Sequence, residues 1–183
     1  MGRLCLPALS ANHAALHSLM QTQNTNYIRA PRSRIFDLAA ATEAWPTILP
    51  HYDSVTVLSR DDAHSRKVVR MAAVRQDFPL PGANFPVSWT SVQVSERELG
   101  KITFKHLRGI ATGMWVEWRL EDDPWGRGVK VSIRHDLRYP FKALNGFFAQ
   151  QIVGALFVSN IAGRTLATIK SIAESEEFRR RTE

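Results

Sequence analysis

The spacing of hydrophobic positions changes along the chain and divides it into three regions. From Asp53 to Arg138 apolar residues recur with a period close to 2, and on either side the period is close to 3.6. A period of 2 is typical of half-buried strands, and a period of 3.6 of amphipathic helices. The pattern predicts six strands with hairpin-length, turn-rich connections, which favours an antiparallel meander. The predicted strands cover residues 53–60, 66–76, 86–95, 101–108, 113–121 and 128–138.

Further elements flank these strands. Residues 24–31 predict a first strand, and Ser33 is placed to cap a helix that runs through Ala41. Residues 42–52 (TEAWPTILPHY) predict a second short helix broken by its two prolines. Residues 141–177 predict a long C-terminal helix. The order of elements predicts an α+β fold in which a curved, seven-stranded antiparallel sheet grips the C-terminal helix.

The two ends of the chain fall outside this pattern. Residues 1–21 lack strand alternation and are expected to be an N-terminal extension, part of which is absent if translation starts at Met20. Residues 22–177 are expected to form one domain, which is long enough to bury a substantial core. Residues 178–183 are expected to form a short basic tail.

The net charge of +7 raises the question of an acidic partner. The cations are scattered, and the one cluster, at residues 179–181, ends a predicted helix, where positive charge is favourable. No zinc finger or aromatic RNA-binding strand accompanies it, so no nucleic-acid partner is expected. Weak attraction to an acidic membrane surface stays open.

Composition also bears on location and on metal chemistry. Cys5 is the single cysteine, which excludes an internal disulfide and a multi-thiolate metal site. The N-terminus is a poor secretory signal, so a cytoplasmic location is expected. The histidines have no partner at i, i+4 and no carboxylate on the same strand face, so no metal site is expected.

One face of the predicted sheet is apolar but interrupted by polar groups. Strand alternation places on this inner face Trp89, Ser91, Gln93, Phe104, His106, Arg108, Trp118, Ile133 and His135. Polar groups on a concave apolar face need partners, which a ligand, ordered water or one another can supply. A few polar groups converging in an apolar cavity are typical of a small-molecule site.

His106 and His135 have two interpretations. The pKa of an unperturbed imidazole, near 6.5, suits a proton-transfer role. The alternative is that each is a hydrogen-bonded core residue. No nucleotide-binding or nucleophile motif occurs in the sequence, so an enzyme of this kind would work without a cofactor.

The order of elements and four segments together resemble a known superfamily. The segments are residues 28–52 (IRAPRSRIFDLAAATEAWPTILPHY), 113–121 (GMWVEWRLE), 131–137 (VSIRHDL) and 162–174 (AGRTLATIKSIAE). Over about residues 22–176 the chain resembles the START/polyketide-cyclase superfamily (SRPBCC). Within it, the chain is similar to aromatic polyketide aromatase/cyclases and to coenzyme-Q-binding START-type proteins. The resemblance implies a helix-grip fold that encloses a hydrophobic cavity.

The resemblance implies roles for two aromatic residues. It also shows that this chain lacks a pocket arginine found in one group of aromatase/cyclases. Tyr52 matches a pocket tyrosine of the aromatase/cyclases, and Trp45 matches a tryptophan of the same segment; a purely structural role is the alternative for each. In tetracenomycin-type aromatase/cyclases a pocket arginine lies four residues after a tryptophan. Counted from Trp89, that position holds Gln93, which supplies no positive charge. Arginine-assisted cyclisation would then need Arg75 or Arg108 as a substitute.

Two functions therefore stay open. One is cofactor-free cyclisation or dehydration of a polyketide, with an acyl-carrier protein as the candidate partner that delivers it; the other is non-enzymatic carriage of a lipid or quinone. The candidate catalytic residues are Tyr52, Arg75, Arg108, His106 and His135. The expected ligand-binding residues are Trp45, Trp89, Ser91, Gln93, Phe104, Trp118, Ile133, Phe148 and Ile152.

Overall fold

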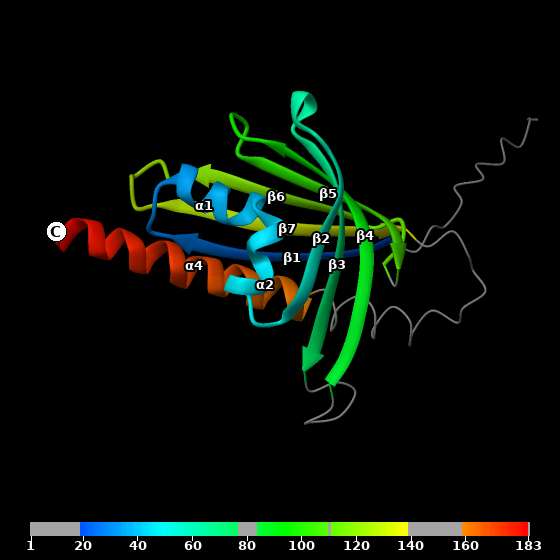
Figure 1. The fold of residues 1–183 in the computed structure, drawn as a ribbon. Helices are drawn as coiled ribbons and strands as arrows, with labels where there is room; N and C mark the ends of the chain where they lie inside the picture. The colour runs from blue at the N-terminus through cyan, green and yellow to red at the C-terminus, as the bar shows by residue number, and fades with distance from the viewer. Residues whose placement is uncertain (1–18, 77–83, 110, 139–158, 183) are drawn as a thin grey trace, which may run out of the picture.

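The computed structural model describes residues 19–76, 84–109, 111–138 and 159–182 (Figure 1). Its elements follow the predicted order. They are β1 (Leu19–Ile28), α1 (Arg32–Ala40), the short 3-10 helix η1 (Thr42–Ala44), α2 (Trp45–Ile48), β2 (Tyr52–Asp61), the 3-10 helix η2 (Asp62–His64), β3 (Arg66–Gln76), β4 (Asn84–Glu96), β5 (Lys101–Gly109), β6 (Trp115–Asp122), β7 (Val129–Arg138) and α4 (Ser159–Thr182).

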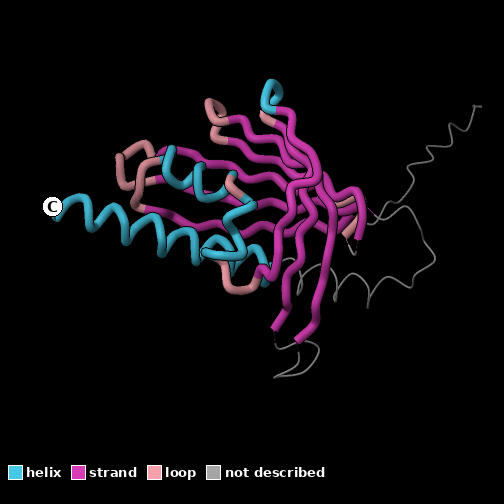
Figure 2. Tube along the Cα trace, viewed as in Figure 1, coloured by secondary structure: helices cyan, strands magenta, loops and turns pink. Residues whose placement is uncertain are grey.

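The strands form one seven-stranded sheet in the order β1-β7-β6-β5-β4-β3-β2, with every neighbouring pair antiparallel. The sheet curves strongly, and α4 runs along the same side of it as α1 and α2 (Figures 1 and 2). The prediction of an α+β, helix-grip architecture is confirmed.

The first strand differs from the prediction at both ends. It begins at Leu19 and ends at Ile28, and its whole length pairs with β7. Residues 19–21 therefore belong to the sheet and not to an extension. The difference arises because β1 reads QTQNTN between its apolar ends, so it has no hydrophobic alternation to detect. Backbone pairing with β7 compensates for the missing alternation.

The boundaries of the helices also differ from the prediction. Helix α1 begins at Arg32 with Pro31 as its N-cap residue and no side-chain cap, so Ser33 lies inside the first turn and is not the cap. The described part of the C-terminal helix starts at Ser159, and residues 141–158 of the predicted helix lie outside the described residues. Helix α4 continues to Thr182, so the predicted basic tail is largely helical.

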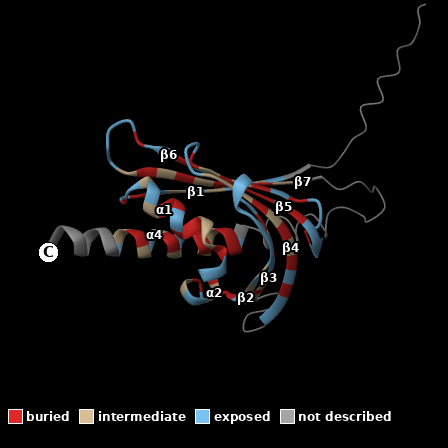
Figure 3. Ribbon diagram, turned by 45° about the horizontal axis from the view of Figure 1, so that its top comes forward, coloured by how far each residue is buried: buried red, intermediate tan, exposed pale blue. Residues whose placement is uncertain are grey.

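The core lies between the concave face of the sheet and the helices, where the buried residues of both are concentrated (Figure 3). Helix α4 contributes apolar residues at helical spacing, namely Ile161, Ala162, Leu166, Ile169 and Ala173, all under a tenth exposed. Among the described helices, none is long and apolar enough to cross a membrane.

Candidate functional site

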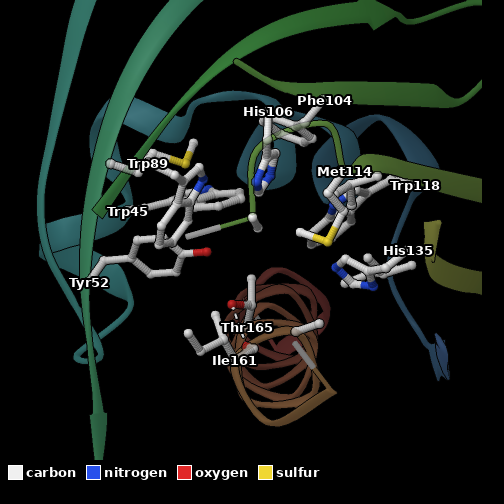
Figure 4. Close-up of a pocket in the computed structure, with 15 residues that line it drawn as sticks. Trp45, Tyr52, Trp89, Phe104, His106, Met114, Trp118, His135, Ile161 and Thr165 are labelled. Carbon is white, nitrogen blue, oxygen red and sulfur yellow. Dashed lines mark hydrogen bonds between the residues drawn. The ribbon is translucent and has the colours of Figure 1, made fainter. Parts of the chain in front are cut away.

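A cavity of about 70 Å³ lies between the concave face of the sheet and the N-terminal turns of the described part of α4 (Figure 4). This volume is several times what a single water molecule needs. Its walls are largely aromatic and aliphatic. The lining residues are Trp45, Tyr52, Met71, Trp89, Phe104, His106, Ala111, Met114, Val116, Trp118, Ile133, His135, Ile161, Ala162 and Thr165.

One wall of the cavity is a cluster of aromatic rings. The ring centroids of Trp45 and Tyr52 are 4.9 Å apart in an edge-to-face arrangement, and those of Tyr52 and Trp89 are 6.1 Å apart. The ring centroid of Trp45 also lies 6.2 Å from that of Phe104 and 6.1 Å from that of Trp118. Its indole N–H donates to the carbonyl oxygen of Leu38 at 3.0 Å. Trp45 thus anchors α2 to α1 and lines the cavity at once.

Two buried histidines, His106 and His135, also line the cavity (Figure 4). His106 stacks on Trp89 with 5.8 Å between ring centroids, and burial lowers its pKa to about 4. Its Nδ1 atom is buried and has no hydrogen-bond partner among the described residues. Burial, and secondarily the proximity of His106, lowers the pKa of His135 to about 3, and its Nδ1 lies 3.4 Å from Oγ1 of Thr22. Both imidazoles are therefore neutral near pH 7.

The Tyr52 hydroxyl points into the cavity (Figure 4). Burial raises the pKa of Tyr52 well above its ordinary value, and the nearby Thr165 side chain opposes that rise only in part. The phenol therefore stays protonated near neutral pH and can donate a hydrogen bond to a ligand. Together with the histidines it gives the cavity three uncharged polar groups.

His51 and Thr165 complete the polar part of the site, and sequence reasoning did not assign either to it. His51 Nε2 lies 2.8 Å from Oγ1 of Thr165, and both side chains are almost fully buried. Helical spacing could have indicated Thr165, because it falls one turn after Ile161 on the buried stripe of α4. No sequence signal pairs it with His51.

Most of the predicted ligand-binding and catalytic residues that the structure describes lie at the cavity. Trp45, Tyr52, Trp89, Phe104, His106, Trp118, Ile133 and His135 all line it. Met114 and Val116 line it too. Phe148, Ile152 and the side chain of Arg75 lie outside the described residues. Ser91 is fully buried in β4 but does not line the cavity.

Gln93 faces a different environment from the one expected. Its amide donates to the carbonyl oxygen of Ala40 at 2.8 Å and to the hydroxyl of Ser95 at 3.0 Å, and it accepts from Thr42 Oγ1 at 2.9 Å. These bonds fasten the end of α1 and the start of η1 to β4. Gln93 is therefore a structural amide in this position, and it is not among the residues that line the cavity.

Arg108 is exposed, in contrast to the inner-face assignment. The pairing of β4 with β5 contains a bulge, in which Ser91 opposes His106 and the neighbouring Thr90 opposes Arg108. Leu107 is the extra residue, so the alternation of β5 reverses beyond it. Simple counting along the strand cannot detect that reversal. Arg108 therefore does not supply to the cavity the positive charge that Gln93 lacks.

No group of three or more His, Cys, Asp or Glu side chains is arranged to hold a metal ion in the part of the chain that the structure describes. The described lining residues also include no lysine or arginine. The chemistry available at the described walls is therefore that of neutral hydrogen-bonding groups in an apolar enclosure.

The family model for polyketide cyclase / dehydrase and lipid transport matches residues 28–156. This range contains all the cavity-lining residues from Trp45 in α2 to His135 in β7. The chain belongs to this family. The comparison with curated proteins gives no match.

Solved structures with the same fold support the architecture. The Zhui aromatase/cyclase from Streptomyces sp. R1128 has 18% identity and a TM-score of 0.69, over 85% of this chain and 94% of that one. The protein TTHA0849 from Thermus thermophilus has 17% identity and a TM-score of 0.68, over 85% and 98%. Ginseng major latex-like protein 151 from Panax ginseng has 12% identity and a TM-score of 0.63, over 85% and 97%. At these identities the likeness concerns the fold alone.

Proposed function

We propose that this member of the family binds a planar, hydrophobic, polyketide-type molecule in the cavity and promotes its cyclisation or dehydration by proton transfer. One observation carries the proposal. An aromatic-walled cavity brings together three uncharged hydrogen-bonding groups, from Tyr52, His106 and His135. Aromatic walls suit a flat ligand, and convergent polar groups fix its orientation.

In the proposed reaction, Tyr52 donates a hydrogen bond to a ketone oxygen and so acidifies the carbon between two carbonyl groups. The neutral imidazole of His106 accepts a proton from that carbon, and the electron pair forms the enolate. The enolate carbon attacks a second carbonyl carbon of the same chain, whose oxygen takes up the proton. Loss of that oxygen as water, with a further proton from the adjacent carbon, then gives an unsaturated ring.

A second candidate function is passive carriage of a quinone or lipid. The specific observation that favours it is the lack of arginine and lysine among the described lining residues, because cyclisation through a stabilised enolate gains from a nearby cation. The positive net charge suits an acyl-carrier protein and an acidic membrane surface equally, so it does not separate the two functions.

The test is to incubate the protein with a linear poly-β-ketone and analyse the products by chromatography and mass spectrometry. We expect wild type to change the product distribution relative to buffer. Tyr52→Phe and His106→Leu should each lower the rate of formation of the enzyme-dependent product by about a hundredfold or more. The exposed Arg108→Ala variant is the matched control and should behave as wild type. Identical products with and without wild-type protein would exclude catalysis and leave the carrier.

A further inference from the structure

The turn between β6 and β7 presents a tryptophan to solvent and holds it in place. The side chain of Trp125 is 76% exposed, although tryptophan is highly buried on average. The carboxylate of Asp123, which is 4% exposed, accepts hydrogen bonds from the backbone N–H groups of Trp125 and Arg127, both at 3.2 Å. It accepts two more from the guanidinium of Arg127, at 2.9 and 3.1 Å, and that guanidinium lies 4.8 Å from the centroid of the Trp125 ring. A specific network therefore fixes the backbone beneath an exposed aromatic ring.

A groove that carries positive charge lies beside this turn. Its lining residues come from β1, the residue after β1, the turn and α4, and they are Tyr27, Arg29, Arg127, Lys170 and Glu174. The ammonium group of Lys170 donates to the carbonyl oxygen of Tyr27 at 2.6 Å and pairs with Glu174. The carboxylate of Glu174 also accepts from the backbone N–H of Arg29 at 2.9 Å. These contacts join α4 to the end of β1.

Two groups in the groove are available to a partner. The guanidinium of Arg29 is exposed and makes no hydrogen bond or ion pair with any residue that the structure describes. The ring of Tyr27 is 54% exposed. Together with the neighbouring turn they form what we call the Trp125 surface, which consists of Tyr27, Arg29, Trp125, Arg127 and Lys170.

The Trp125 surface lies away from the cavity. The turn after β6 and the C-terminal half of α4 are found at the same end of the molecule (Figures 1 and 3). The cavity instead faces the N-terminal turns of the described part of α4, at Ile161, Ala162 and Thr165. A ligand in the cavity therefore does not cover the exposed rings.

We propose that the Trp125 surface binds an acidic helical segment of a partner protein. Trp125 and Tyr27 are the apolar anchors, and the guanidinium groups of Arg29 and Arg127 pair with carboxylates. Tryptophan, tyrosine and arginine carry much of the binding energy at protein interfaces, and a surface held in place before binding loses little conformational entropy. An amphipathic helix can present apolar side chains and carboxylates to one groove. The inference goes beyond the proposed function and does not rest on it.

Charge and shape favour this partner over two others. A second copy of the chain carries the same net charge of +7, so the two copies repel each other, whereas an acidic protein is attracted. An anionic bilayer is attracted as well. A bilayer surface is flat and fluid, however, so it neither fills a groove nor gains from a tryptophan whose backbone is fixed.

The experiment uses a synthetic helical peptide about four turns long, with leucine along one face and glutamate elsewhere. Its binding to nitrogen-labelled protein is followed by nitrogen–proton NMR. We expect a saturable shift of the Trp125 indole signal and of the backbone signals of Tyr27 and Arg29. Affinity should fall several-fold when the ionic strength rises from about 0.05 M to about 0.3 M. The indole signal of Trp115, which is 41% exposed, should stay in place, and the same peptide with lysine for glutamate should not bind.

Substitutions then assign the binding to named residues. Trp125→Ala and Arg29→Ala should each weaken the glutamate peptide about tenfold. Trp115→Ala is the matched control and should bind as wild type does. Asp123→Asn is the sharpest variant because it removes a negative charge, so attraction between charges alone predicts tighter binding. We expect weaker binding instead, by about threefold or more, because the variant loses the ion pair that holds Arg127 and the turn.

Four results would overturn the proposal. They are equal binding of the glutamate and lysine peptides, unchanged affinity in Trp125→Ala, tighter binding by Asp123→Asn, and no shift at Trp125 with the glutamate peptide. In the last case, vesicles of phosphatidylglycerol and phosphatidylcholine that bind through Trp125 would make the surface a membrane contact. None of these measurements uses a cavity ligand, so their failure leaves the proposed function untouched.

Discussion

Gln93 shows how a single polar residue can be decisive for the fold without facing the ligand. It is fully buried, and its amide holds the junction of α1 and η1 against β4 through bonds to Ala40, Thr42 and Ser95. Close to the same junction, the ammonium group of Lys67 donates to the carbonyl oxygen of Ala40 and forms an ion pair with Glu43. Partial burial alone would raise the pKa of Glu43, but hydrogen bonds from Lys67, from a backbone N–H and from Arg60 lower it to about 2.

We therefore predict that Gln93→Leu lowers the free energy of unfolding by about 1–3 kcal/mol, because it leaves the buried hydroxyl of Thr42 without its acceptor and removes one of the two donors to the carbonyl oxygen of Ala40. Affinity for a cavity ligand should stay close to that of wild type. Chemical denaturation and ligand titration of the same samples measure the two quantities. Weakened binding at unchanged stability would show instead that Gln93 contacts the ligand.

At the level of elements, the β4–β5 pair shapes the cavity wall that carries Trp89 and His106. Gly109 ends β5 with a φ of +100°, and a Cβ atom there would lie 2.3 Å from the carbonyl oxygen of Ser88. The strands can pair closely at Trp89 because residue 109 has no side chain. Gly113, in the following turn, also has a positive φ of +87°, but open space surrounds its Cβ position.

This contrast gives a matched pair of substitutions. Gly113→Ala should cost about 1 kcal/mol, the strain of a non-glycine residue at positive φ. Gly109→Ala should cost clearly more and should also weaken ligand binding, since the backbone of β4 must move beside Trp89. Thermal unfolding and fluorescence titration of both variants test this. Equal losses for the two would mean that the close approach at Gly109 does not shape the cavity.

The elements also show where sequence reasoning reaches its limit. Regular alternation in β6 and β7 was sufficient to place Trp118, Ile133 and His135 on the inner face, and all three line the cavity. It failed at Arg108 because a bulge one residue earlier reverses the strand face, and a bulge leaves no clear mark in the sequence. It could not pair His51 with Thr165, because contacts between residues far apart in sequence depend on how α4 lies on the sheet.

For the whole molecule, the buried histidines connect stability to pH. The folded-state pKa values of about 4 for His51 and His106 and about 3 for His135 lie below the unfolded value near 6.5. As pH falls below about 6.5, the unfolded chain binds protons at these residues while the folded chain does not. The free energy of unfolding therefore falls with pH until the folded-state pKa values are reached.

At pH 5 we expect a loss on the order of 2 kcal/mol for each fully buried histidine relative to pH 7.5. Urea denaturation at the two pH values measures it. His106→Leu should remove its share of the pH dependence. A stability that does not change between pH 7.5 and 5 would contradict the burial of neutral imidazoles.

The most direct test of the central claim, that a flat hydrophobic ligand occupies the cavity, uses the five tryptophans of the chain as internal reporters. Trp45, Trp89 and Trp118 line the cavity, whereas Trp115 and Trp125 are 41% and 76% exposed elsewhere. Titration with a planar aromatic polyketide, followed through the indole N–H signals in nitrogen–proton NMR spectra, should shift the first three signals saturably and leave the other two in place. Shifts confined to Trp115 and Trp125, or none at all across a panel of such ligands, would contradict the claim.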